Sequence, residues 1–415
     1  MDTLGDIDPQ QREPESVSGN YYTHRLHKRQ PYYNKNVILP GELITFTPPN
    51  LDTDTLMAQN TWCMTYDLEL TGKKDDKQFV VWNLEKSIVD VLRVKIKNKT
   101  VLEIDDYSTL QNYLTIHKTE NELKRSIFEG VQLERDLKAR LAAETANTGQ
   151  EEIKRVYGKR FKLNFNMLPL FNSFGPIYPK ALKEITIEIR FAPVDKVVRG
   201  SSTTKITATD KDYDYRLTNL KVEWDEFKHP LFAQKMTHKY LTTPLKYKKI
   251  SRIPNETMKK SDKLKHVRFN THRASISGFL VIMVDEGKRS AYNHETNQFY
   301  NPKFTKFEIS YKESSYRVFE NGLLPRDAFD SILKLVPETD LKEVDFYTQG
   351  FALWVDTRLS TNNSLHETGF KFNEGDAVNI AIHRAGETGD DTITIYTYIF
   401  EDATIELMKK PVMIQ

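Results

Sequence analysis

The chain has 415 residues, more than the ~100–200 of one usual domain and enough for two. Hydrophobic residues make up 39% and charged residues 28%, so the chain can build cores and is not wholly disordered. Sixty Lys plus Arg against 58 Asp plus Glu exclude nucleic-acid binding by bulk positive charge, and the single Cys63 excludes a disulfide-stapled scaffold or a Cys-based zinc site.

Residues 1–35 show almost no periodic apolar pattern and predict an extended N-terminal arm, acidic in its first half and basic and aromatic in its second. Tyr and Arg are enriched in protein interface hot spots, so this arm is interpreted as a docking segment for a protein partner. The alternative is a single-stranded nucleic acid, with phosphates neutralised and bases stacked. The basic part of the arm contains only three formal cations, which favours a protein partner over a nucleic acid. The candidate docking residues are Tyr21, Tyr22, Arg25, Lys28, Arg29, Tyr32 and Tyr33.

Short strand-like runs bounded mostly by Pro, Gly, Asn or Asp follow the arm. The alternation is strict in Glu184–Phe191, where Ile185, Ile187 and Ile189 share one face. The strands expected in the first half are Glu42–Thr47, Thr61–Leu70, Ser87–Lys97, Val101–Ile104, Arg160–Asn166, Glu184–Phe191 and Leu217–Phe227.

Helical spacing interrupts the strands in three places. It predicts helices over residues 107–116, over 119–142 behind a capping box at Thr119–Glu122, and over 326–335 between two prolines. The polar stretches 143–158 and 196–214 are predicted to be surface loops.

A second series of strands begins after Pro244. Together the two series predict an all-β fold of two tandem antiparallel sandwiches, with short helices in the connecting loops. The strands expected in the second half are Leu245–Ile250, Lys265–Asn270, Ser275–Val284, Lys303–Tyr311, Arg317–Phe319, Gly350–Val355, Asp376–His383 and Asp391–Phe400.

Catalytic and metal motifs are incomplete in this sequence. His294 and His366 are each followed by Glu, but Gln298 and Phe370 stand where a zinc protease needs its second His. No dinucleotide or nucleophile-elbow motif is present. The acidic pairs at 105–106 and 285–286 are interpreted as turn formers rather than as a glycosidase acid and base. We therefore expect no enzyme activity and no catalytic, cofactor-binding or metal-binding residues.

Several patches, taken in order, resemble major capsid proteins of the double jelly-roll kind over residues 36–410. The resemblance is strongest to the Polinton/Maverick and adintovirus relatives, and weaker to virophage and adenovirus hexon capsid proteins. The patches are Trp62–Leu68, Val80–Leu84, Ile127–Gln132, Tyr157–Phe161, Leu217–Trp224, Ser275–Ile282, Phe299–Pro302 and Ser315–Gly322.

The resemblance implies two eight-stranded jelly rolls, at residues 36–228 and 245–415, with a linker at 229–244. It implies a structural major capsid protein that trimerises into pseudo-hexagonal capsomers and tiles an icosahedral shell. The implied location is the virion, after synthesis and assembly inside the host cell. The implied partners are neighbouring capsomers and, through the arm, a penton or minor capsid protein.

Three further expectations come from the residues themselves. No apolar run approaches the ~18 residues of a membrane-spanning helix, and the small net charge predicts no strong nucleic-acid binding. Cys63, beside Trp62, is expected to be a small buried hydrophobe. The alternative function is a carbohydrate-binding or glycoside-hydrolase β-sandwich, which would need an aromatic platform and a cleft with paired carboxylates.

Overall fold

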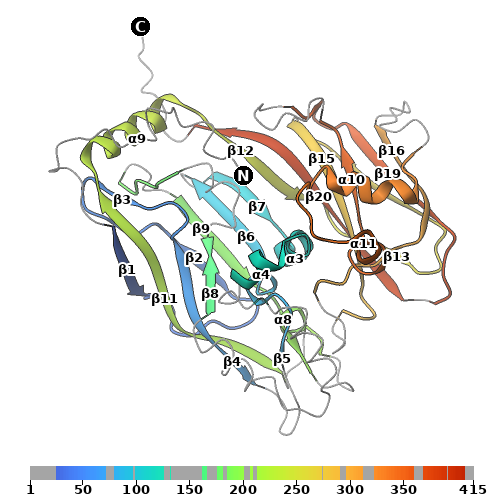
Figure 1. Cartoon of the computed structure of the whole chain (residues 1–415), viewed down its shortest axis with the longest axis horizontal. Helices are drawn as coiled ribbons and strands as arrows, with labels where there is room; N and C mark the ends of the chain where they lie inside the picture. Colours follow the sequence, from blue (N-terminus) through green and yellow to red (C-terminus); the bar gives the residue numbers. More distant parts are fainter. Residues whose placement is uncertain are drawn as a thin grey trace.

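The chain folds into two β-sandwiches that stand side by side (Figure 1). The computed structural model describes residues 25–71, 79–96, 99–125, 131, 161–165, 175–180, 185–200, 206–208, 213–272, 274–289, 296–311, 322–358, 368–389 and 391–406.

The first sandwich is made of two antiparallel four-stranded layers. One layer has the order β1 (Leu26–Pro31), β11 (Asp214–Lys228), β4 (Cys63–Thr71) and β8 (Phe161–Asn164). The other has the order β2 (Leu43–Phe46), β9 (Ile185–Phe191), β6 (Val89–Ile96) and β7 (Lys99–Ile104). The short β3 (Thr55–Met57) extends the first layer beside β11, and β5 (Phe79–Val80) pairs with β10 (Val198–Arg199).

The second sandwich repeats this topology. One layer runs β12 (Leu245–Arg252), β20 (Thr392–Ile405), β15 (Ala274–Asp285) and β17 (Ala352–Asp356), with β13 (Glu256–Lys259) and β18 (Phe370–Phe372) added. The facing layer runs β14 (Leu264–Asn270), β19 (Ala377–Arg384) and β16 (Phe304–Tyr311). In both sandwiches the first strand pairs with the last, which is the jelly-roll arrangement. The predicted all-β fold of two tandem jelly rolls is confirmed; the strand expected at 317–319 lies outside the described residues.

Helices lie in the connections, as expected. The predicted helix at 107–116 is α3 (Tyr107–Thr115), and the one at 326–335 is η4 (Pro325–Asp327) followed by α10 (Ala328–Leu333). Of the helix expected at 119–142, α4 (Glu120–Arg125) is described and nearly all of the rest lies outside the described residues. The remaining helices are α2 (Leu84–Ser87), α8 (Val194–Val197), α9 (Pro230–Thr242) and α11 (Glu343–Thr348).

Several connections contain regular structure that the sequence patterns did not predict, including α2, α9 and α11. Helix α9 occupies the stretch between β11 and β12; Pro230 sits in its first turn and the His229 side chain accepts a hydrogen bond from the Phe232 N–H. The stretch 196–214, expected to be a loop, begins instead with the end of α8 and with β10. That loop prediction was wrong at its start because β10 is fixed by pairing with distant β5. The loop predicted at 143–158 lies outside the described residues.

Alternating burial in the strands builds the core. In β9 the apolar positions are buried and the intervening ones face outward, as the sequence alternation predicts. Most buried apolar side chains of the two sandwiches form one continuous cluster, and Trp82 and Val131 form a small separate one. Cys63 is 1% exposed, so the expectation of a small buried hydrophobe is confirmed.

Gly278 carries a packing constraint in β15. Its strand is central, between β20 and β17, and the register shifts between Ile276 and Gly278. A Cβ at this position would lie 2.4 Å from the Trp354 ring and 2.5 Å from the Val355 carbonyl oxygen. The backbone oxygen cannot rotate away, so only glycine fits.

We expect Gly278→Ala to lower the free energy of unfolding by about 2–3 kcal/mol, because overpacking forces the strand or the ring to move. Urea unfolding monitored by tryptophan fluorescence measures this. Gly375→Ala is the matched control: it has a positive φ of 81° but nothing within 4 Å of an added Cβ, so it should cost about 1 kcal/mol. Equal losses in the two variants would contradict the packing argument.

Candidate functional site

Asp106 is the centre of a charged junction between the two jelly rolls. It lies between β7 and α3 in the left-handed conformation, with φ 47° and ψ 40°. Its carboxylate is 2.9 Å from the Lys196 Nζ, 3.4 Å from Arg252 Nη1 and 3.3 Å from the Asn255 Nδ2. Lys196 belongs to the first jelly roll, whereas Arg252 and Asn255 belong to the second. One carboxylate therefore holds both together.

The backbone of Asp106 contributes to the same junction. Its carbonyl oxygen accepts a hydrogen bond of 2.9 Å from the Tyr398 hydroxyl of β20. A second tyrosine bridge runs from the Tyr247 hydroxyl of β12 to the Val101 carbonyl of β7, at 2.8 Å. Burial would raise the pKa of Asp106, but the positive charges of Lys196, Arg252 and Arg289 outweigh it and lower that pKa. The carboxylate is ionised at neutral pH.

The cations around Asp106 have further acidic partners. Lys196 also lies 2.7 Å from Asp90, which in turn accepts from Arg190 at 2.9 Å. Burial would lower the pKa of Lys196, but Asp106 and Asp90 raise it. Arg289 pairs with Glu286 at 3.1 Å. Positive and negative charges are thus interleaved, so the junction is a neutralised network and not a strongly charged cleft.

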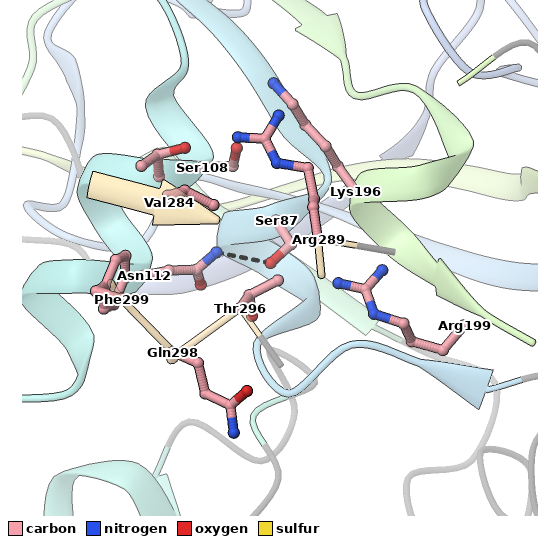
Figure 2. A pocket seen from close by; sticks show the side chains of 11 residues that line it. Ser87, Ser108, Asn112, Lys196, Arg199, Val284, Arg289, Thr296, Gln298 and Phe299 are labelled. Carbon is pink, nitrogen blue, oxygen red and sulfur yellow. Dashed lines mark hydrogen bonds between the residues drawn. The ribbon is translucent and has the colours of Figure 1, made fainter. Parts of the chain in front are cut away.

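A cavity of about 50 Å³, lined mostly by polar residues together with Val284 and Phe299, lies beside this network (Figure 2). Figure 2 shows Asn112 donating to Ser87, with Lys196, Arg199 and Arg289 around the same space; the Asn112–Ser87 distance is 2.9 Å. Water fits such a space, since one molecule needs roughly 10–15 Å³ and two or more polar partners.

The chemistry of this cavity is limited by what lines it. The described lining residues supply hydroxyls, amides and cations, and no carboxylate or imidazole is among them. A glycosidase cleft needs two carboxylates across the scissile bond. The described part of the wall therefore does not offer the arrangement that the alternative function requires.

His117 joins the two jelly rolls a turn beyond α3. It is 1% exposed, its Nδ1 is 2.8 Å from the Thr339 hydroxyl, and its ring meets the Tyr113 ring edge-on. Its Nε2 is buried without a hydrogen-bond partner among the described residues. Burial lowers the pKa of His117 to about 4, so the imidazole is neutral at physiological pH.

The basic residues of the predicted arm lie on β1 or, for Arg25, directly before it, and they face a row of acids on β11. This acidic row consists of Glu223, Asp225 and Glu226. Arg25 is 2.6 Å from Asp225, Arg29 is 2.7 Å from Glu223, and Lys28 is 3.3 Å from Glu226. His27 lies 2.8 Å from Asp225 and 3.5 Å from Glu223. Each basic side chain of the strand thus has an acidic counterpart.

The aromatic residues of the predicted arm are not gathered at one place. Tyr21 and Tyr22 lie outside the described residues. Tyr32 packs on Phe46, with ring centroids 5.0 Å apart, and its hydroxyl donates to the Thr45 carbonyl. Tyr33 is 80% exposed. The structure therefore brings the cations together on β1 and separates Tyr32, which supports the core, from Tyr33, which faces solvent.

Some residues that matter most were not singled out from the sequence. Asp106 was interpreted as a turn former, and its left-handed backbone confirms that role, but its ion pairs reach residues 90 and 146 positions away. Lys196 lies in the stretch predicted to be a loop. The acidic row on β11 could have been noticed as an acidic complement to the basic arm.

The described residues also bear on metals and membranes. No group of three or more His, Cys, Asp or Glu side chains within the described ranges is arranged to hold a metal ion. None of the described helices has the length and apolar character needed to cross a bilayer.

Comparison with known proteins gives similarity in structure only. No family model matches the sequence, and no curated protein matches it. The structure is similar to the Faustovirus major capsid protein, with a TM-score of 0.57 and 8% identity over 96% of this chain and 94% of the other. It is similar to PBCV-1 VP54, fitted into a reconstruction of the virophage Sputnik, with a TM-score of 0.57 and 8% identity over 94% of this chain and 97% of the other. The structure is also similar to the mavirus major capsid protein, with a TM-score of 0.51 and 10% identity over 100% of this chain and 99% of the other. The chain therefore has the double jelly-roll fold of viral major capsid proteins.

Proposed function

We propose that this chain is a structural major capsid protein that forms homotrimeric, pseudo-hexagonal capsomers and tiles an icosahedral viral shell in the virion. The single observation that carries the proposal is two jelly rolls of one topology, joined side by side in a chain that matches capsid proteins over nearly the whole length of both. Three such chains give six similar lobes, which is a shape that tiles.

The division of the chain follows from this proposal. We place the jelly rolls at residues 36–228 and 245–415, joined by the segment 229–244 that contains α9, and we add β1 to the first jelly roll because it pairs with β11. From residues 1–35, we propose that the part before β1 reaches a penton or minor capsid protein. The charged junction then has a structural role, since it fixes the angle between the two lobes on which tiling depends.

The proposal predicts the size of the purified protein. Three chains of 48.4 kDa give a trimer of about 145 kDa, and we expect size-exclusion chromatography with light scattering to show it. Electron micrographs should show flat hexagonal particles or closed shells. A stable monomer that retains or cleaves polysaccharide would instead support the alternative function and overturn the capsid proposal.

A further inference from the structure

Strand β1 is attached to its sheet differently from its counterpart in the second jelly roll. Both β1 and β12 are edge strands that pair with the last strand of their own jelly roll. In β12 the side chains of Leu245, Tyr247 and Ile250 are buried. None of the six side chains of β1 is buried. The two strands occupy the same position, yet only β12 is anchored by the core.

What holds β1 is its backbone ladder and a match of charges. The register places Arg29 opposite Glu223 and Leu26 opposite Glu226, so the basic side chains run along the acidic row on β11. Ion pairs between partly exposed groups contribute little each, about 0–1 kcal/mol, and they weaken in salt. No buried apolar side chain of β1 would be exposed if the strand left the sheet, because Leu26 is already 51% exposed. The strand is specified by charge but is weakly attached.

Exposed apolar side chains are concentrated in the chain segment that contains and follows β1. Of the eight large hydrophobic side chains that are exposed among the described residues, five belong to residues 26–43: Leu26, Tyr33, Val37, Leu39 and Leu43. β1 lies at the outer edge of the first jelly roll, away from the second (Figure 1). This concentration in one stretch of the chain favours a contact with another protein chain there.

We infer that β1 is exchanged between copies, so that the acidic row on β11 of one chain receives β1 of a second copy of this chain. The turn after β1, at residues 33–35, is the hinge, and the ladder and ion pairs formed in trans are those already seen within one chain; Tyr32 moves with β1, because its N–H bonds the Leu220 carbonyl of β11. Exchange of an identical element is a low-cost route to oligomers. This inference rests on the proposed assembly. In a ring of three, each chain donates one strand and receives one, so that every acidic row is occupied.

A cysteine pair tests the exchange without touching an ion pair. Gln30 and Val222 face each other across the β1–β11 ladder. In trimers of the Gln30→Cys, Val222→Cys double variant, oxidation should give covalent products of two and three chains on a non-reducing gel. Gln30→Cys with Lys246→Cys, an exposed residue of β12, is the control and should give none.

The possible outcomes are separable. Intact trimers whose crosslink stays within one chain overturn the exchange and leave the capsid proposal standing. A wild-type protein that forms no trimer overturns the capsid proposal itself. If the double variant fails to fold, chains with only Gln30→Cys are mixed with chains carrying only Val222→Cys before assembly; an interchain disulfide supports exchange, and its absence in mixed trimers contradicts it.

Discussion

Replacing Asp106 with Ala should destabilise the protein by about 4 kcal/mol. Removing one partner of a buried ion pair costs roughly 3–5 kcal/mol, because the remaining charge is left in a poorly solvated site. The low end, about 3 kcal/mol, is expected here, because the Asp106 and Lys196 side chains are 15% and 14% exposed and Lys196 keeps Asp90 as a partner. Here the charges left behind are Lys196 and Arg252, one in each jelly roll. Alanine also tolerates the left-handed backbone at this position poorly, which adds about 1 kcal/mol. Urea unfolding at neutral pH measures the sum.

Two other substitutions at Asp106 separate these causes. Asp106→Asn keeps the side-chain volume and the tolerance of a positive φ, so the decrease in its free energy of unfolding reports the charge alone. Asp106→Gly relieves the backbone but removes the carboxylate, so it should be slightly more stable than Asp106→Ala. If Asp106→Asn were as stable as the wild type, the carboxylate would not be what joins the two jelly rolls.

Acidification should weaken the protein through His117. In an unfolded chain a histidine has a pKa near ~6.5, whereas burial lowers the pKa of His117 to about 4 in the folded protein. The unfolded chain therefore takes up the proton first as the pH falls. The stability that this histidine contributes is fully present above about pH 6.5 and is lost between there and about pH 4. The expected loss is about 3 kcal/mol, at about 1.4 kcal/mol per pKa unit.

His117→Gln tests this assignment. Glutamine can still bond the Thr339 hydroxyl but does not titrate, so the free energy of unfolding of the variant should vary less between pH 6.5 and 4 than that of the wild type. His238→Gln, on the exposed face of α9, is the matched control and should keep the wild-type slope. Parallel pH profiles for the wild type and His117→Gln would show that another group is responsible.

Local patterns predicted the elements whose formation depends on neighbouring residues. The alternation of Ile185, Ile187 and Ile189 predicted β9, and the helical spacing from Tyr107 predicted α3. The spacing of apolar residues is a property that a short window of sequence contains. It gave the buried face of β9 correctly, but α3 is buried on nearly all sides, polar residues included.

Elements fixed by distant partners were not predictable in this way. β1 has no apolar alternation, because its place is set by acids on β11 about 200 residues later. The role of Asp106 depends likewise on Lys196 and Arg252, which approach only when both jelly rolls have formed. A window of sequence shows that Asp106 can turn the chain, but not which charges surround it.

The difference between β1 and β12 has a consequence for the geometry of a lattice. A hexagonal tile can be set into its place in six rotations, sixty degrees apart. If three chains form the hexagonal capsomer, its corners alternate between first and second jelly rolls. The first edge strand is then β1, held by charge, at one corner and β12, held by the core, at the next. Neighbours that distinguish these corners accept only three of the six rotations. The difference between two otherwise matching jelly rolls would therefore fix how each capsomer is rotated about its own axis, and so how adjoining capsomers are oriented relative to one another.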